Sequence, residues 1–212
     1  MDSLSELEEY QTARPLKLEG NARLLYTRLR NQLVGASNDG KLASSPAEIH
    51  RLIQFFMSMH ERVADDVRRL GVTDGAFSIT GGEKNQARST TVRHFKRNDG
   101  AWFDFTLTGR QGHGCIELLA YDFEIRLAPG FGTPFLRFDL NLPGHRNESR
   151  DLRCHVHCGS DDLLLPAPLM APRELLTLMI DGIRFSPLRE RRTVTPFELN
   201  WLSTSLSVLS RS

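Results

Sequence analysis

Two histidines placed two residues apart, His155 and His157, are the side chains in this sequence best suited to chemistry. Imidazole gains and loses a proton near neutral pH, and it also binds transition metals. In a β-strand, alternate side chains point to the same face, so both rings would share one face. The segment around them supports a strand, because apolar residues alternate with the polar ones: Leu152, Cys154, Val156 and Cys158.

Two earlier segments show the same alternation and supply charged partners. From Tyr121 to Leu127 and from Phe135 to Leu142, every second residue is apolar and most of the residues between are charged. If the three segments pair as an antiparallel meander, side chains on neighbouring strands lie about 5 Å apart. The polar face would then gather Asp122, Glu124, Arg137, Asp139, Arg153, His155 and His157.

Such a face could cleave a phosphate ester without a metal. His155 or His157 would act as general acid or base on a ribose hydroxyl or a leaving oxygen. Arg137 and Arg153 would hold the phosphate and stabilise the transition state. A carboxylate, Glu124 or Asp139, would orient one imidazole. This version needs no cofactor.

A divalent metal is the alternative, with His155, His157 and either Asp139 or His145 as ligands, because two histidines and a carboxylate form a recognised open metal site. A purely structural interpretation also exists. Charged residues cover most solvent-facing sheets, and Arg–Asp pairs on adjacent strands fix their register.

A loop of charged residues, Pro143 to Asp151, joins the second and third segments. It could bring His145, Arg146 and Arg150 over the polar face as substrate-binding residues, together with Asp122 on the sheet.

The three cysteines, Cys115, Cys154 and Cys158, favour reduced thiols in a cytoplasmic protein, because their number is odd and residues 1–10 lack a secretory signal. A structural zinc site of Cys154, Cys158 and the histidines is disfavoured, because strand alternation puts thiols and imidazoles on opposite faces. The thiols are more simply small buried residues.

The elements that would position these residues predict an α+β fold. We expect an antiparallel meander sheet of about five to six strands, one face packed by helices, with helical N- and C-terminal segments. Turn sequences at Asn98-Asp99-Gly100, at Gly112 and Gly114 and at 129–134 separate the strands. Broken alternation near Leu118-Leu119-Ala120 predicts a bulge.

Four helices are predicted. The first carries leucines at helical spacing from Leu24 and ends at Gly35. The second opens with a capping box, Ser45 to Glu48, and continues along an apolar stripe to Leu70. The others span about 172–183 and 195–209. We expect residues 1–45 to be a peripheral helical extension and residues 46–212 to be a single α+β domain.

Composition limits the class of partner. The 27 basic and 26 acidic residues leave a formal charge of +1, so the chain is not strongly basic. Because 23 of the 27 basic residues are arginine, the composition fits phosphate or nucleic-acid contact, and it also fits the codon usage of a genome rich in G and C. No apolar stretch approaches the roughly 20 residues that cross a bilayer, so we expect no membrane partner.

The order Arg137-Phe138-Asp139, a charged loop, His155-x-His157, a proline-flanked segment and a helix resembles the layout of small bacterial toxin–antitoxin proteins of the TumE type. The resemblance covers about residues 121–183, and this chain is longer at its N-terminus. It implies a bacterial toxin or phage-defence role against nucleic acid, with Arg137, Asp139, His155 and His157 as the matching positions.

Three functional hypotheses follow. The first is a bacterial cytosolic effector that acts on nucleic acid, RNA above all, as a ribonuclease or phosphotransfer-type hydrolase, with a cognate antitoxin as partner. The second is a non-catalytic subunit of a larger complex that binds a protein or nucleic acid through the polar face or the connector 184–192. The third is a metal-dependent enzyme for small molecules.

Overall fold

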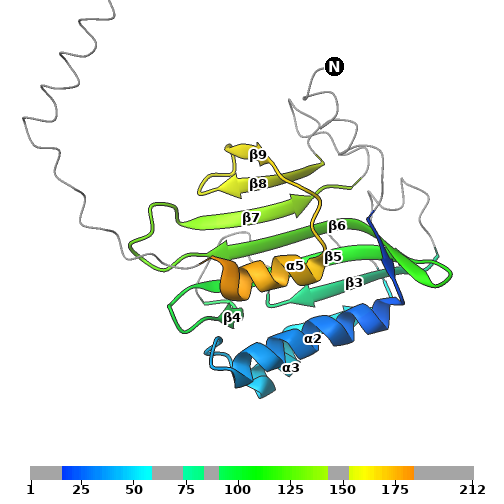
Figure 1. Ribbon diagram of the computed structural model, residues 1–212, viewed down its shortest axis with the longest axis horizontal. Helices are drawn as coiled ribbons and strands as arrows, with labels where there is room; N and C mark the ends of the chain where they lie inside the picture. Colours follow the sequence, from blue (N-terminus) through cyan, green and yellow to red (C-terminus); the bar gives the residue numbers. More distant parts are fainter. Residues whose placement is uncertain (1–15, 59–73, 84–90, 143–152, 184–212) are drawn as a thin grey trace, which may run out of the picture.

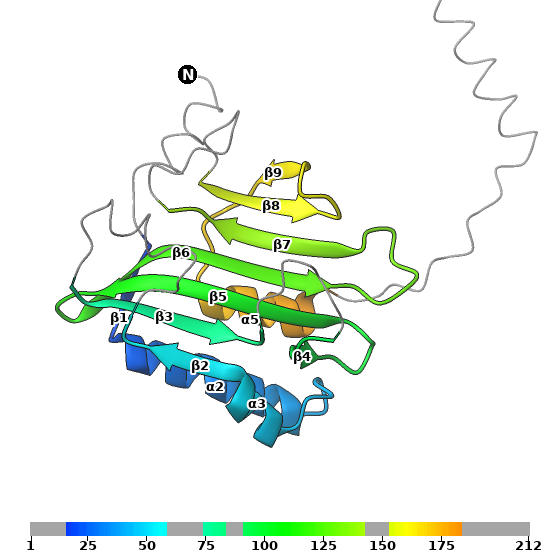
Figure 2. The same ribbon diagram turned by 180° about the vertical axis from the view of Figure 1, so that it is seen from behind.

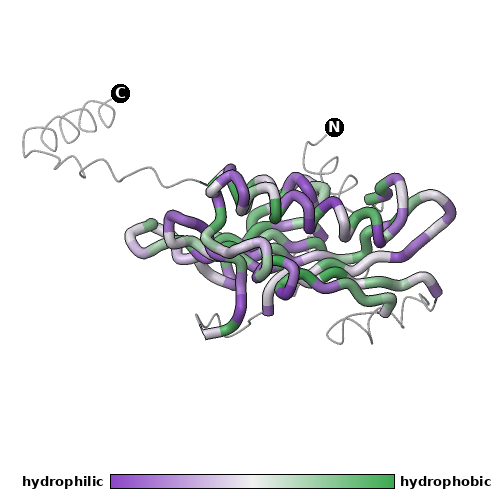
Figure 3. The backbone as a smooth tube through the Cα atoms, turned by 90° about the horizontal axis from the view of Figure 1, so that it is seen from below, coloured by the Kyte–Doolittle hydropathy of each residue, from purple (hydrophilic) through white to green (hydrophobic). Residues whose placement is uncertain are grey.

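The computed structural model describes residues 16–58, 74–83, 91–142 and 153–183. They form an α+β fold in which an open antiparallel sheet carries helices on one face (Figures 1 and 2). Seen along its edge, the helices form a layer of their own beside the sheet (Figure 3).

The sheet has nine strands, and their path is β2-β3-β5-β6-β7-β8-β9, with β1 paired to β6 and β4 paired to β5. The strands are β1 (Leu16–Glu19), β2 (Ile53–Phe56), β3 (Ala76–Gly81), β4 (Phe95–Lys96), β5 (Trp102–Gln111), β6 (Cys115–Arg126), β7 (Phe135–Leu140), β8 (Cys154–Cys158) and β9 (Leu164–Pro166). The described helices are α2 (Ala22–Asn38), α3 (Pro46–Leu52) and α5 (Pro172–Thr177), the last continued by a π-helical turn η1 (Leu178–Gly182).

Several local signals are confirmed. The predicted meander is β6-β7-β8, and Asn98 to Gly100 forms the turn between β4 and β5, with Gly100 at a φ of 85°. The predicted bulge is also present. Thr108 pairs with Ala120 and Gly109 with Leu118, so Leu119 is the extra residue.

The sheet is larger than the five to six strands expected, because short edge segments add to it. β1 and β9 contain four and three residues, too few for alternation to be recognised. β2 lies in a segment that we expected to be helical. The capping box at Ser45 is confirmed, yet α3 ends at Leu52 and the chain turns into a strand paired with β3.

The first helix also differs from expectation. Gly35 does not end α2, which continues to Asn38. Nor is this helix peripheral, because Leu29 and Leu33 have no exposed surface and belong to the main core. The N-terminal residues 1–15 and the expected helix at 195–209 lie outside the described residues.

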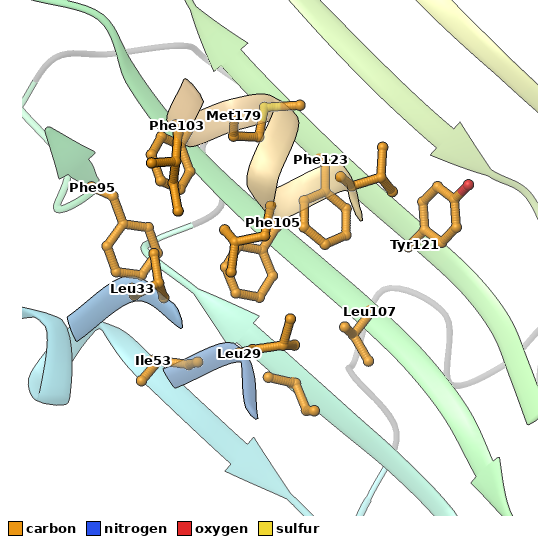
Figure 4. Close-up of a cluster of buried hydrophobic side chains, with 14 of the residues drawn as sticks. Leu29, Leu33, Ile53, Phe95, Phe103, Phe105, Leu107, Tyr121, Phe123 and Met179 are labelled. Carbon is orange, nitrogen blue, oxygen red and sulfur yellow. The ribbon is translucent and has the colours of Figure 1, made fainter. Parts of the chain in front are cut away.

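The core lies between the sheet and the helices. Phe103, Phe105 and Phe123 project from β5 and β6 toward Met179 and the α2 leucines (Figure 4). The rings of Phe105 and Phe123 stack at 4.8 Å between centroids. This apolar layer takes up one face of the central strands, so their alternate side chains are left on the opposite face.

No helix among the described residues is long and apolar enough to span a membrane.

Two glycines provide a test of this packing. A Cβ on Gly81 would overlap the ring of Phe105, whereas a Cβ on Gly35 meets nothing within 4 Å among the described residues. We expect Gly81→Ala to lower the free energy of unfolding by about 1–3 kcal/mol, because overpacking displaces a buried ring. Gly35→Ala should raise it by about 0.5–1 kcal/mol through higher helix propensity. Urea unfolding of both variants measures the difference, and equal effects would contradict the described packing.

Candidate functional site

Three side chains on β7 and β8 meet on the sheet face opposite the helices. The Nε2 atoms of His155 and His157 are 3.2 Å apart. Asp139 Oδ2 lies 3.4 Å from the first and 3.2 Å from the second. Three ligand-type atoms therefore form a nearly equilateral triangle, which we call the Asp–His–His cluster.

Strand pairing explains this convergence. β7 and β8 run antiparallel, with Asp139 opposite His155 and Arg137 opposite His157. Because His155 and His157 are two residues apart, their rings share the face to which Asp139 points. Phe138 and Leu140 alternate with the charged residues of β7, and both belong to the helix-side core or pack against it. Burial of these apolar residues fixes which face the cluster occupies.

Arg137 connects the cluster to the surrounding carboxylates. Its Nε donates to Asp139 Oδ2 at 3.0 Å, and its Nη1 donates to Asp161 Oδ1 at 2.7 Å. Glu124 on β6 lies directly opposite Arg137, with its Oε2 3.9 Å from Nη1. The guanidinium thus lies between Asp139, Asp161 and Glu124.

The cluster is buried, although its residues are charged or titratable. The side chains of His155 and His157 are 1% and 6% exposed, and that of Asp139 is 13% exposed. Burial works to raise the pKa of Asp139, but hydrogen bonds to His155 and His157 and the charge of Arg137 outweigh it. The pKa of this carboxyl therefore lies well below its usual range.

The reverse effect acts on Arg137. Burial works to lower the pKa of its guanidinium, but the carboxylates of Asp139 and Asp122 outweigh this and raise it. Arg137 and Asp139 therefore both remain charged at neutral pH. Asp122 lies beside this pair, because it is directly opposite Asp139 on β6.

Arg153 is used differently from our expectation. Its Nε donates to the carbonyl of Asn141 at 3.1 Å, and its Nη2 donates to that of Leu119 at 3.4 Å. These bonds tie the start of β8 to the neighbouring chain. The loop residues His145, Arg146 and Arg150 lie outside the described residues.

Two acidic residues near the cluster were not identified from the sequence. Asp104 is buried on β5 opposite Glu124, and alternation with Phe103 and Phe105 would have placed it on the polar face. Asp161 follows β8 after a turn at Gly159, whose φ is 76°. No strand pattern extends to Asp161, so the sequence gives no signal for its contact with Arg137.

The cysteines take no part in the cluster. Cys115, Cys154 and Cys158 are thiols and not disulfides, and Cys154 is buried on the helix side, with its Sγ 3.5 Å from the hydroxyl of Tyr121. Burial raises the pKa of the Cys154 thiol, which disfavours the thiolate. The expected separation of thiols and imidazoles on opposite faces is confirmed.

Within the described part of the chain, Asp139, His155 and His157 are the set of three or more His, Cys, Asp or Glu residues whose ligand atoms converge closely enough to hold a metal ion. The arrangement therefore permits either proton transfer by imidazole, with a guanidinium beside it, or coordination of a cation.

Comparison of the chain with protein-family models, with curated proteins and with solved structures yields no match. The resemblance to TumE-type proteins thus stays a prediction that depends on the residues alone.

The lowered pKa of Asp139 predicts how stability depends on pH. The ionised carboxylate of Asp139 stabilises the folded state. This stabilisation is lost progressively as the pH falls below about 3.9, which is the pKa of an aspartate in an unfolded chain. We expect Asp139→Asn to cost about 3 kcal/mol at pH 7, because it leaves the charge of Arg137 with one carboxylate fewer. The deficit should shrink as the pH falls below about 4.

Urea unfolding from pH 7 down to about pH 2 measures the effect. Asp74→Asn, at an exposed position, is the matched control and should follow the wild-type curve. A constant deficit at every pH would contradict the assigned role of the ionised carboxylate.

Proposed function

We propose that this protein cleaves phosphodiester bonds in nucleic acid, with RNA as the preferred class of substrate, at the Asp–His–His cluster and Arg137. The observation that carries the proposal is the contact of two imidazoles, a carboxylate and a guanidinium on one pair of strands. These groups meet the two requirements of phosphate-ester cleavage, which are activation of an attacking oxygen and stabilisation of negative charge on the phosphate.

Arg137 is the residue proposed to bind the phosphate. Its guanidinium is planar and matches two oxygens of a phosphate as well as those of a carboxylate. Asp161, whose side chain is 55% exposed, is the most exposed of the carboxylates around it. A substrate phosphate would take the place of Asp161 at Nη1, while Asp139 keeps Nε oriented.

The TumE resemblance motivates the biological part of the proposal. It favours a toxin or defence effector in a bacterial cytoplasm, held inactive by a cognate antitoxin or complex subunit. Inhibition by a partner is compatible with the proposed replacement of Asp161 by phosphate at Arg137. A partner that holds Asp161 against Arg137 would prevent phosphate from binding there.

A non-catalytic binding subunit is the other candidate. The residues that favour it are exposed hydrophobic side chains in or next to the two edge strands, β2 and β9: Phe56, Met57, Leu163 and Leu165. Copurification of a stoichiometric partner, together with no turnover of RNA or DNA, would favour this role over the enzyme.

Substitution of the cluster tests the proposed activity. We expect His157→Ala and His155→Ala each to reduce RNA cleavage at least about 100-fold, the range typical for loss of a proton-transfer or nucleophile-activating group. His113→Ala, in the exposed turn between β5 and β6, is the control and should leave the rate unchanged. Circular dichroism verifies folding, and full activity in both cluster variants would eliminate the proposal.

Asp161 offers a separate test with the opposite sign. Asp161→Asn removes the carboxylate that competes with phosphate for Arg137. We expect the KM for RNA to fall by about 3- to 10-fold while kcat changes little, because a rim charge acts mainly on binding. An increased KM would show that Asp161 supports substrate binding instead.

A further inference from the structure

We propose that Asp139 Oδ2, His155 Nε2 and His157 Nε2 coordinate one divalent first-row transition-metal ion. This inference goes beyond the proposed function, since the ion would bind whether or not nucleic acid is the substrate. It rests on the separations of the three atoms, their hydrogen-bond capacity and the charges around them.

The separations match a coordination sphere. With metal–ligand bonds of about 2.1 Å, two ligands are about 3.4 Å apart at tetrahedral angles and about 3.0 Å apart at octahedral angles. The three distances among Asp139, His155 and His157 are 3.2, 3.2 and 3.4 Å. One ion could therefore bind all three atoms on one side of the triangle without rearrangement of either strand.

Hydrogen bonding alone accounts poorly for the same contacts. A carboxylate oxygen has about two lone-pair sites, yet Asp139 Oδ2 faces Arg137 Nε and both imidazole Nε2 atoms. The other oxygen, Oδ1, is buried and accepts no hydrogen bond from the described residues. If both Nε2 atoms carried protons, those protons would also crowd each other across 3.2 Å. Two bare Nε2 lone pairs directed at a shared cation remove this conflict.

The ligand set indicates which metals would bind. Imidazole nitrogen suits zinc, iron, cobalt, nickel and copper, whereas magnesium and calcium prefer oxygen. Two nitrogens and one oxygen from His155, His157 and Asp139 therefore favour a transition metal over magnesium. Three protein ligands also leave coordination positions for water or a phosphate oxygen, as catalytic metal sites require.

The surroundings of the cluster suit a cation. Arg137 donates to Asp139, as outer residues usually do to a carboxylate ligand. The carboxylates of Glu124, Asp122 and Asp161 lie close enough to Arg137 to offset its positive charge. A fourth carboxylate, that of Asp104 on β5, is opposite Glu124. These carboxylates would balance the charge of the ion without supplying its ligands.

Metal titration of the full chain tests the inference. The chelator-treated protein is titrated with Co²⁺ and followed by visible absorption, with Zn²⁺ as the competitor. We expect one ion per chain, displacement by Zn²⁺, and no competition from millimolar Mg²⁺. Absence of Co²⁺ and Zn²⁺ binding below about 100 μM would overturn the inference.

Variants locate the site. Asp139→Asn and His157→Ala should each weaken Co²⁺ binding at least about 100-fold, more than typical losses from outer-shell changes. The double variant His50→Ala with His113→Ala removes two exposed histidines and should bind as the wild type does. Loss of binding in this control, or wild-type binding in both cluster variants, would place the metal elsewhere.

Stability of the wild type provides a measurement that does not require a cluster variant to fold. Zn²⁺ should raise the Tm in a concentration-dependent manner, because an ion that binds only the folded state stabilises it. No rise in the Tm of the wild type at Zn²⁺ concentrations well above about 100 μM would overturn the inference.

The inference and the proposed function fail separately. Metal binding without RNA cleavage would overturn the function and leave the metal site. Cleavage that persists in a chelator, by a protein that binds no Co²⁺, would overturn the metal site and leave metal-free acid–base chemistry.

Discussion

The register between β7 and β8 is the constraint on which the candidate site depends. It places Asp139 opposite His155 and Arg137 opposite His157, so four polar groups from two strands become neighbours. A shift of one residue would turn both imidazoles toward the helices and present Cys154 and Val156 in their place. The register is held from the helix side, where Leu140 and Cys154 are buried in the main core. Apolar packing on one face therefore determines the polar geometry on the other.

The site combines burial with charge in a way that a solvent-facing sheet does not. Asp104, Glu124, His155 and His157 are all buried, although each is polar. Burying such groups is costly unless opposite charges or hydrogen bonds compensate them. Arg137 provides much of that compensation, because it touches three carboxylates from different segments. One guanidinium thus connects β6, β7 and the chain after β8.

Strand alternation was the most informative signal in the sequence. It placed Glu124, Arg137, Asp139 and the two histidines on one face, and the turn and bulge signals near Gly100 and Leu119 were also correct. The alternation of side chains along a strand is a local property, so it can be recognised without knowledge of tertiary contacts. Two features could not be predicted from local sequence, because they depend on distant segments of the chain. They are the burial of this face and the identity of the groups that contact Arg137. Asp161 and the carbonyl partners of Arg153 belong to this second class.

Helix boundaries were less predictable, because periodicity alone cannot distinguish short apolar runs. The run at Ile53 fits a helical stripe as well as a strand, and pairing with β3 decides the outcome. Sheet size was underestimated for a related reason. Strands of three or four residues, such as β1 and β9, are too short for alternation to identify, and their pairing with β6 and β8 makes them part of the sheet.

The extra residue in β6 has a consequence for the whole strand. Before Leu119, Ile116 and Leu118 pack into the main core; after it, Tyr121 and Phe123 do so. Leu119 itself joins a separate apolar group with Ala76 and Leu142. One strand of 12 residues thus contributes side chains to two hydrophobic clusters, and the bulge keeps the apolar residues on both sides of it facing the main core. Deleting this single leucine would turn the bulge into a regular strand, because Leu118 and Tyr121 would then be two residues apart and both halves would stay paired with β5. Inserting or deleting a paired residue on either side would instead turn one half of the strand away from the core.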